Sequence, residues 1–385
     1  MIKFLHFADA HIDYAKQGLR DPESGIPLRV LDFLKSLDYI VDSAITQSVD
    51  LVVFSGDAYR DRTPAPTYQR EWDERINRLS NAGIQTILLL GNHDLTPATG
   101  RAHTMQEFKT LKVPNVHIID APCVLGPEEL GLQVHVIGIP WMYGNNEALP
   151  GIISDLLNSL DGNLPHILTA HLSVEGAVYS SERSIMLGTD MSISRSVLED
   201  DRIDYVALGH IHKYQNVWED GHHPIIYPGS IERVDFGEVN DRKTFVIGEV
   251  ERGKTIFNVY DLPCRKFIDL SVTIDTEKDV MQQIMEVMSE NMDDAMVRLN
   301  ITYPRDIEAM IDEELIRQKA EKAFEFQLHK KPQTQSRIRL ATNEPIASLT
   351  PLELLNKYWE VMPPTEDKES LSEMGNEIIQ TVRQQ

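Results

Sequence analysis

The stretch TILLLGNHDL, from Thr86 to Leu95, decides the fold. Its apolar half suits a buried strand. The run then breaks into Gly91-Asn92-His93-Asp94, where an amide, an imidazole and a carboxylate follow one another. Residues of these types also form ordinary turns, so the stretch alone is a weak signal. Its meaning depends on whether other strands of the chain end in the same way.

Four further apolar runs are followed, at once or after one glycine, by an aspartate or a histidine. They are KFLHFA before Asp9, DLVVFS before Asp57, PHILTA before His171 and YVAL before His210. In open α/β sheets, ligands bind outside the carboxyl ends of the strands. A turn explains one polar strand end, but five ends of one chemical type predict a shared site on an α/β fold.

The side chains at these strand ends suit divalent metal ions. Imidazole and carboxylate together favour manganese, iron or zinc, whereas an all-oxygen set favours magnesium or calcium. The period of two in extended chain is expected to place Asp9 and His11 on one side, and His210 and His212 likewise. Seven ligands are too many for one tetrahedral zinc and fit two ions that share a carboxylate. The candidates are Asp9, His11, Asp57, Asn92, His171, His210 and His212.

A site with two divalent ions predicts a particular reaction. Such ions clamp the attacking and leaving oxygens of an in-line displacement at phosphorus. The leaving oxygen then needs a proton, and His93 is the candidate acid because it follows a ligand but belongs to no ligand pair. We expect Asn92 to coordinate, His93 to protonate the leaving group or steady the phosphate, and Asp94 to orient or cap the turn.

Composition limits the remaining possibilities. A chain of 385 residues predicts two or three domains, and 42% hydrophobic with 25% charged residues is typical of a soluble globular protein. The formal net charge of −23 argues against nucleic acid, although bound divalent ions make a cleft less negative than the count. Two distant cysteines exclude a cysteine metal site and favour the cytoplasm. No apolar run approaches a membrane span, and Asp9 interrupts any signal peptide.

The pattern along the chain predicts three regions. Residues 1–262 alternate apolar runs with amphipathic helices and end in an antiparallel sheet of IIYPGSIERV, KTFVIGEVE and KTIFNVYDL. Residues 267–343 predict a small domain with a helix from Asp306 to Phe326 and a last strand from Arg337 to Ala341. Residues 349–385 predict two short helices whose apolar faces lack a core of their own, so they are expected to dock on a partner.

Several motifs carry a resemblance to a known family. ADAH, SGDAYRDR, LGNHDL, TAHLSVEGA and LGHIHKYQ occur in the order of the calcineurin-like metallophosphoesterases. The segment YPGSIERVDFGE, from Tyr227 to Glu238, is similar to that of the SbcD-type nucleases of SbcCD DNA-repair complexes. The likeness covers residues 1–260 well. It implies an α/β fold of two sheets flanked by helices, with a small α+β capping domain and a C-terminal helical tail.

The resemblance also implies the roles of the site residues and the reaction. One ion is expected on Asp9, His11, Asp57 and His212, and the other on Asp57, Asn92, His171 and His210. Asp57 would then bridge two Mn²⁺ ions, and His93 would be catalytic. The activity implied is that of a DNA nuclease, exonucleolytic on double strands and endonucleolytic on single strands.

Partners are implied by the same likeness. The capping domain is expected to contact DNA and the tail to dock on a coiled-coil ATPase of the SbcC type. The helix from Thr67 to Ala82 and the segment from Ala102 to Leu111 would pair two nuclease subunits into a homodimer. The helix's apolar stripe of Tyr68, Trp72, Ile76 and Leu79 is equally explained by packing on its own sheet.

The sequence departs from the family at Arg60, where relatives often carry histidine or aspartate. Two interpretations stay open: Arg60 clamps a phosphate, or Asp61 supports the catalytic histidine in its place. The other candidates for DNA contact are Arg62, Lys330, Lys331, Arg337 and Arg339. The alternative function is a stand-alone metallophosphodiesterase or nucleotidase acting on a small substrate, which the acidic charge favours.

Overall fold

The computed structural model describes residues 1–14, 18–95, 102–144, 146–160, 162–180, 191–218, 221–333, 350–361, 371, 373–376 and 378–379. Contacts divide the chain into two compact units. The first comprises residues 1–269, 292–297 and 323–325, and the second comprises residues 270–291, 298–322 and 326–385. Each unit is described by itself below.

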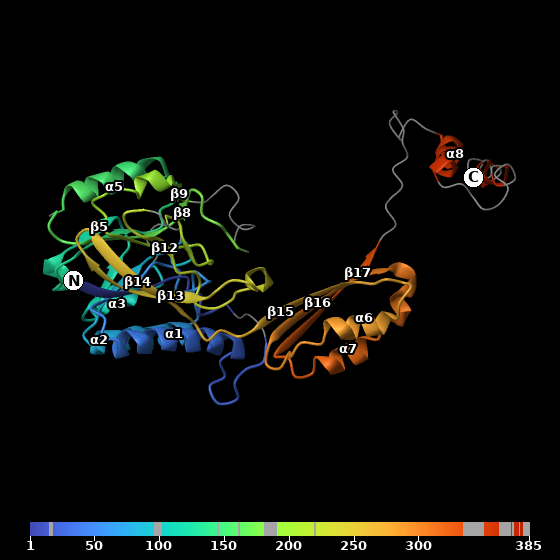
Figure 1. Ribbon diagram of the computed structural model, residues 1–385, viewed down its shortest axis with the longest axis horizontal. Coiled ribbons are helices and arrows are strands. Elements are labelled where there is room, and N and C mark those ends of the chain that lie inside the picture. The colour runs from blue at the N-terminus through green and yellow to red at the C-terminus, as the bar shows by residue number, and fades with distance from the viewer. Residues whose placement is uncertain are drawn as a thin grey trace. The chain divides into compact units, whose positions relative to one another are not determined.

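The first unit contains two six-stranded sheets (Figure 1). The first sheet has the order β14-β13-β1-β2-β3-β4, in which β1 to β4 are parallel. Its strands are β1 (Ile2–Phe7), β2 (Leu51–Phe54), β3 (Gln85–Leu89), β4 (Val116–Ile119), β13 (Thr244–Glu251) and β14 (Lys254–Asp261). The expected antiparallel pairing of KTFVIGEVE with KTIFNVYDL is present, and β13 also pairs antiparallel with β1.

The second sheet has the order β11-β12-β10-β7-β6-β5. Its strands are β5 (Cys123–Leu125), β6 (His135–Ile139), β7 (His166–His171), β10 (Tyr205–Gly209), β11 (Gln215–Asn216) and β12 (Ile225–Tyr227). The expectation that IIYPGSIERV shares an antiparallel sheet with KTFVIGEVE and KTIFNVYDL was wrong, although its strand β12 pairs antiparallel with β11. Only the first three residues of IIYPGSIERV form a strand, which runs parallel to β10, because Pro228 and the left-handed Gly229 turn the chain away.

Three apolar layers hold the first unit together and confirm the predicted two sheets flanked by helices. Between the sheets lie Phe4, Val53, Ile87, Ile167 and Ala207, all fully buried. Helices α1 (Leu28–Thr46) and α2 (Pro66–Asn81) pack on the outer face of the first sheet, and α5 (Leu149–Asn158) packs on that of the second. Figure 1 shows these helices on opposite sides of the sheets. The smaller elements are α3 (Gln106–Leu111), α4 (Pro127–Leu130), β8 (Ser173–Val174) and β9 (Ser192–Ile193).

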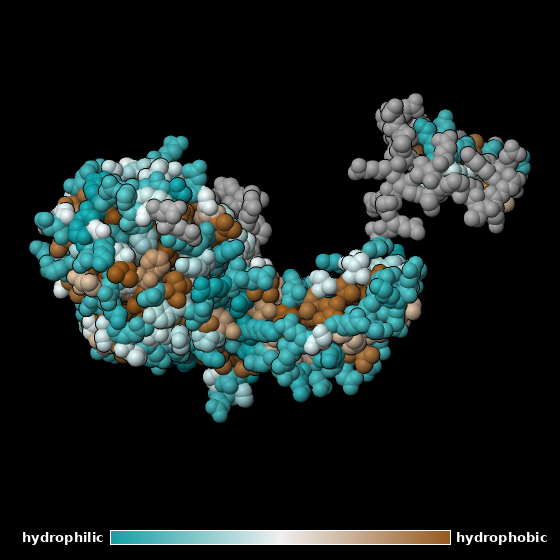
Figure 2. Space-filling model, viewed as in Figure 1, coloured by the Kyte–Doolittle hydropathy of each residue, from teal (hydrophilic) through white to brown (hydrophobic). Residues whose placement is uncertain are grey.

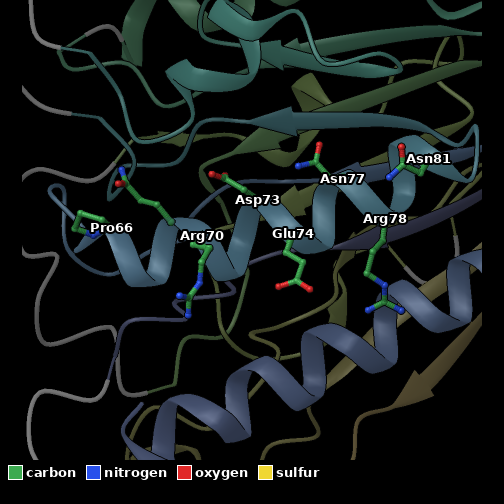
Figure 3. A pocket seen from close by; sticks show the side chains of 8 residues that line it. Pro66, Arg70, Asp73, Glu74, Asn77, Arg78 and Asn81 are labelled. Carbon is green, nitrogen blue, oxygen red and sulfur yellow. The ribbon is translucent and has the colours of Figure 1, made fainter. Parts of the chain in front are cut away.

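Helix α2 turns its apolar stripe inward. Trp72, Ile76 and Leu79 are at most 1% exposed and belong to the core on the first sheet. The outward face is polar, and Figure 3 shows Arg70, Asp73, Glu74, Asn77 and Arg78 along it. The stripe therefore packs on its own sheet, which was one of the two explanations for it.

The second unit is built around a three-stranded sheet of order β15-β16-β17. Its elements are β15 (Phe267–Thr273), α6 (Val280–Val287), β16 (Met296–Pro304), α7 (Glu313–Lys319) and β17 (Glu325–Gln333). The single helix expected from Asp306 to Phe326 was wrong, because a 3₁₀ turn at Arg305–Met310 leads to an extended Ile311 and α7 begins only after Asp312 caps it. The expected last strand at 337–341 lies outside the described residues.

Helix α8 (Pro351–Val361) follows in the C-terminal region. None of its side chains that the structure describes is buried, and Tyr358 is 43% exposed. Among the helices that the structure describes, none combines the length and apolar character needed to cross a membrane.

Candidate metal centre

The seven candidate ligands lie at the carboxyl ends of five parallel strands. Asp9, Asp57 and Asn92 follow β1, β2 and β3 of the first sheet. His171 ends β7, and His210 and His212 follow β10, which is parallel to β7 in the second sheet. The two sheets pack face to face, so these strand ends meet along one edge of the first unit.

Three of the candidate ligands form a first group. The Nε2 atoms of His11 and His212 are 3.1 Å apart, and the donor atoms of Asp9, His11 and His212 all lie within 4.8 Å of one another. All three residues are buried. This group contains three of the four side chains expected around the first ion.

A second group is centred on Asn92. Its Oδ1 atom lies 3.0 Å from His171 Nε2 and 3.2 Å from His210 Nδ1. Asp57 lies between the groups, because its Oδ2 atom is 3.4 Å from His171 Nε2 and 3.8 Å from His11 Nε2. The structure thus places Asp57 where a bridging carboxylate is expected.

The backbone at these ligands is unusual. Asp9, His11, Asp57 and His210 have φ values of 52°, 39°, 63° and 98°. Residues other than glycine rarely adopt such φ values, and each costs of the order of 1–2 kcal/mol. The expected extended spacing of two in Asp9-x-His11 and His210-x-His212 was therefore wrong. Left-handed turns direct these side chains inward, and strain of this kind collects at functional sites.

Glycines before the ligands permit the close approach. A Cβ atom on Gly91 would lie 2.1 Å from Asp57 Oδ1, and one on Gly209 would lie 2.1 Å from the carbonyl oxygen of Ser55. Both contacts are far inside van der Waals distance. The Gly91-Asn92 and Gly209-His210 pairs are therefore required by packing between the strand ends.

The donor set fits divalent ions. Atoms that bind one ion at about 2.1 Å lie roughly 3.0–3.4 Å from each other. The His11–His212 distance of 3.1 Å and the distances of 3.0 and 3.2 Å from Asn92 to His171 and His210 lie in this range. Burial raises the pKa of Asp9 to about 6. Burial lowers the pKa of His171, but the charge and hydrogen bond of Asp57 outweigh it and raise that pKa to about 9. The buried carboxylates of Asp9 and Asp57 therefore attract positive charge, which divalent ions would supply.

His93 adjoins this cluster without belonging to it. Its Nδ1–H donates to the carbonyl oxygen of Arg60 at 2.7 Å, its backbone N–H donates to Asp57 Oδ1 at 2.9 Å, and its ring lies edge-on to His11. Within the described residues its Nε2 atom makes no hydrogen bond. The half-buried ring is thus held at one nitrogen and open at the other, as an acid requires.

Asp94 serves the backbone of the site. Its carboxylate accepts hydrogen bonds from the N–H groups of Asp57, Ala58 and Gly91 and from the Thr104 hydroxyl, at 2.8–3.2 Å. Burial, followed by the charge of Asp57, raises its pKa to about 7. Asp94 is fully buried and ties two ligand loops together, so it positions the site and does not contact a substrate.

The loop after Asp57 forms one wall of a cleft of about 720 Å³ beside His93. Arg60 stacks over Tyr14 with 4.7 Å to the ring centroid, and Arg62 reaches the carbonyl of Asn92 at 3.4 Å. Neither arginine pairs with a carboxylate in the described part of the chain, and Asp61 hydrogen-bonds Thr63. The carbonyl of Arg60, and not the carboxylate of Asp61, holds His93.

The basic residues of the second unit differ in their surroundings. Lys330 pairs with Glu308 at 3.1 Å and with Glu313 at 2.7 Å. Lys331 is exposed, and neighbouring residues of a strand point to opposite faces. Arg337 and Arg339 lie outside the described residues. Lys330 thus has carboxylate partners, whereas Lys331 remains available to an anion.

Two neighbours of the ligands were not expected from the sequence. Trp141 follows β6 and lies 5.1 Å from the His210 ring, and Glu238 contacts Nδ1 of His212 at 2.8 Å. The strand-end pattern could have identified Trp141, because β6 is parallel to β7. No spacing rule identifies Glu238, which lies 26 residues after His212.

Comparisons with known proteins also indicate a metal-dependent phosphoesterase. A family model described as calcineurin-like phosphoesterase matches residues 2–214. The chain is 26% identical over 283 residues to SbcD, a component of the nuclease SbcCD, of Staphylococcus epidermidis, covering 66% of this chain and 73% of that protein. It is 25% identical over 303 residues to the DNA double-strand break repair protein Mre11 of Methanosarcina acetivorans, covering 76% and 44%.

The chain is 25% identical over 252 residues to the uncharacterized metallophosphoesterase YhaO of Bacillus subtilis, covering 64% of this chain and 57% of that protein. The chain therefore spans less than two thirds of this relative and of the archaeal one. The resemblance inferred from the motifs is confirmed at the level of the family.

Proposed function

We propose that this chain, which belongs to the calcineurin-like phosphoesterase family, is a manganese-dependent DNA nuclease that works with a coiled-coil ATPase of the SbcC type. Membership of the family, with nucleases among its relatives, makes it a metal-dependent phosphoester hydrolase. The proposal adds the metal, the DNA substrate, the exonuclease activity on double strands, the endonuclease activity on single strands and the partner.

One observation carries the proposal. Seven candidate metal ligands converge from five strand ends, and four of them do so through a strained left-handed backbone. A fold tolerates strain of this kind where the surrounding structure fixes it for a function. The mixture of imidazole, carboxylate and one amide suits manganese, iron or zinc, and the resemblance to the SbcD-type nucleases selects Mn²⁺ among them.

The chain's own residues then account for hydrolysis of a phosphodiester. Asp9, His11, Asp57 and His212 would hold one ion, and Asp57, Asn92, His171 and His210 the other. Such a pair of ions supplies an activated water and stabilises charge on the phosphate oxygens. Nε2 of His93, with the ring fixed through Nδ1 by Arg60, delivers the proton to the leaving oxygen. Asp94 keeps the loops of Asp57 and Gly91 in register.

The cleft beside His93 supports a polyanionic substrate. Arg60 and Arg62 line it without a carboxylate partner in the described residues, whereas Arg75, Arg78 and Arg252 of the same unit are all paired with aspartates. The carboxylate of Asp13, in the lining, accepts hydrogen bonds from the backbone N–H groups of Arg60 and Asp61. The same lining carries the carboxylates of Asp13 and Asp61. Two guanidinium groups that form no ion pair among the described residues, next to the acid, suit the phosphates of a nucleic acid strand.

Binding of an ATPase and formation of a homodimer are supported by fewer observations than the metal centre is. The resemblance assigns the C-terminal helices to docking of the ATPase, and the unburied side chains of α8 support this. A homodimer through α2 rests on the resemblance alone, because the stripe of this helix is used in its own core. The proposed domains at 1–262, 267–343 and 349–385 and the cytoplasmic location remain proposals.

A small-substrate phosphodiesterase or nucleotidase is the second candidate. It is favoured by the net charge of −23 and by the neutralisation of Lys330. Digestion of linear duplex DNA with Mn²⁺, with and without the ATPase, distinguishes the two when bis-p-nitrophenyl phosphate is assayed alongside. A nuclease digests the DNA, whereas hydrolysis of the small diester alone under both conditions would favour the second candidate.

A further inference from the structure

We propose that Glu238 and Lys243 are positioning residues for the ligand His212 and that this buried pair sets how tightly the site holds one of its ions. The inference rests on the proposed metal centre, to which it adds two residues. Glu238 ends a 3₁₀ turn at Phe236–Glu238, and Lys243 lies directly before β13. Lys243 therefore adjoins the first sheet, whose strands β1 and β2 lead into Asp9 and Asp57.

Glu238 holds the imidazole of His212. Its Oε1 atom accepts a hydrogen bond from His212 Nδ1–H at 2.8 Å. Its Oε2 atom accepts hydrogen bonds from the ammonium of Lys243 at 2.7 Å and from the backbone N–H of Val234 at 2.9 Å. Glu238 is 0% exposed and Lys243 is 3% exposed. The carboxylate is thus engaged on both oxygens, and only one of these bonds serves the candidate ligand.

Lys243 holds the backbone of the same histidine. Its ammonium also donates to the carbonyl oxygen of His212 at 3.1 Å and to the Ser230 hydroxyl at 2.8 Å. The Glu238–Lys243 ion pair therefore hydrogen-bonds both the ring and the main chain of His212. Two contacts from one buried ion pair to the same candidate ligand favour a positioning role over a contribution to stability alone.

The hydrogen bond to Nδ1 determines which nitrogen is presented to an ion. With the proton on Nδ1, the lone pair is on Nε2, the atom that lies 3.1 Å from His11 Nε2. A carboxylate behind a ligating histidine fixes the tautomer and ring orientation and increases the basicity of the ligand. Lys243 balances the charge of Glu238, which would otherwise be buried without compensation.

The buried pair of Asp204 and Arg252 offers a matched control. Asp204 is 2% exposed, pairs with Arg252 at 2.8 Å and accepts two backbone N–H groups, but it contacts no candidate ligand. Asp204→Asn should lower the melting temperature of the metal-free chain. It should leave the affinity for Mn²⁺ within about twofold of wild type.

The test is calorimetric titration of Mn²⁺ into the metal-stripped full chain. Two double variants remove the charged pair while keeping the interior neutral: Glu238→Gln with Lys243→Met, and Glu238→Leu with Lys243→Met. Only the glutamine can still accept the Nδ1–H of His212. We expect the leucine variant to bind one of the two ions about 10–100-fold more weakly, and the glutamine variant to lose less affinity for the same ion.

A single variant tests the geometry if the leucine variant does not fold. Glu238→Asp keeps the charge that Lys243 needs but withdraws the acceptor from Nδ1, so it should weaken the same ion by about tenfold. Wild-type affinity for both ions in either the leucine or the aspartate variant would overturn the inference. A wild-type chain that binds no Mn²⁺ would instead overturn the metal centre itself, so the two failures are distinguishable.

Discussion

At the scale of single residues, His93 and Asp57 should separate proton transfer from metal binding. His93 touches the cluster only through its backbone N–H and ring edge, so His93→Gln should leave two ions bound. Hydrolysis of bis-p-nitrophenyl phosphate should fall by about 10²–10⁴-fold, the contribution of a general acid. Elemental analysis measures the ions, and their loss from this variant would make His93 a ligand.

Asp57→Ala should instead lose metal and activity together, because Asp57 lies within 3.8 Å of nitrogens in both groups. Asp261→Ala is the control, since its carboxylate pairs with Arg242 on the surface and should be neutral. Full occupancy of both ions in the Asp57 variant would exclude a bridging role.

Gly91 tests how tightly the strand ends are packed. Gly91→Ala puts a methyl group 2.1 Å from Asp57 Oδ1, so it should destabilise the protein by about 1–3 kcal/mol and weaken metal binding. Gly151→Ala, in α5 with no atom within 4 Å of the new Cβ, should be neutral or stabilise by up to about 1 kcal/mol. Equal melting temperatures and metal affinities for the two variants would show that the clash is relieved without cost.

At the scale of elements, the sequence predicts the strands that end in ligands and fails where the pattern is ambiguous. β1, β2, β3, β7 and β10 were all found from apolar runs before polar residues. The turns after β1 and β10 could not be found in this way, because left-handed φ values at Asp9 and His210 depend on contacts across the molecule. The false helix through Phe326 arose because the charged, periodic stretch around α7 hides the start of β17.

Deleting residues 349–385 tests the role of the C-terminal helices. Hydrolysis of bis-p-nitrophenyl phosphate should remain near wild type, since no candidate catalytic group lies there. Binding to an SbcC-type ATPase should weaken, because α8 leaves apolar side chains such as Tyr358 unburied. Calorimetric titration with the ATPase measures this, and unchanged affinity would contradict the docking role.

At the scale of the whole molecule, the proposed DNA binding would have to overcome the acidic charge. On the face seen in Figure 2, hydrophilic residues dominate the first unit, and the chain carries 60 acidic against 37 basic residues. The proposed binding would therefore depend on local groups such as Arg60, Arg62 and Lys331, which form no ion pair with a carboxylate in the described residues.

Adjacent lysines of β17 offer a test of this. Lys331→Gln should flatten the slope of log affinity against log salt by about 0.9, the change expected for one lost phosphate contact. Lys330→Gln should change it less, because Glu308 and Glu313 already bind this ammonium. Filter-binding titrations of duplex DNA over a salt series measure both slopes. Identical slopes in both variants and wild type would place this strand away from DNA.

The central claim is that seven strand-end side chains hold two ions with Asp57 between them. The most direct measurement is anomalous diffraction at the manganese edge from crystals of the full chain grown with Mn²⁺. The account predicts two peaks about 3.5–4 Å apart, one beside His11 and His212 and the other beside Asn92 and His171, with Asp57 touching both. A single peak, or two peaks that Asp57 does not join, would contradict it.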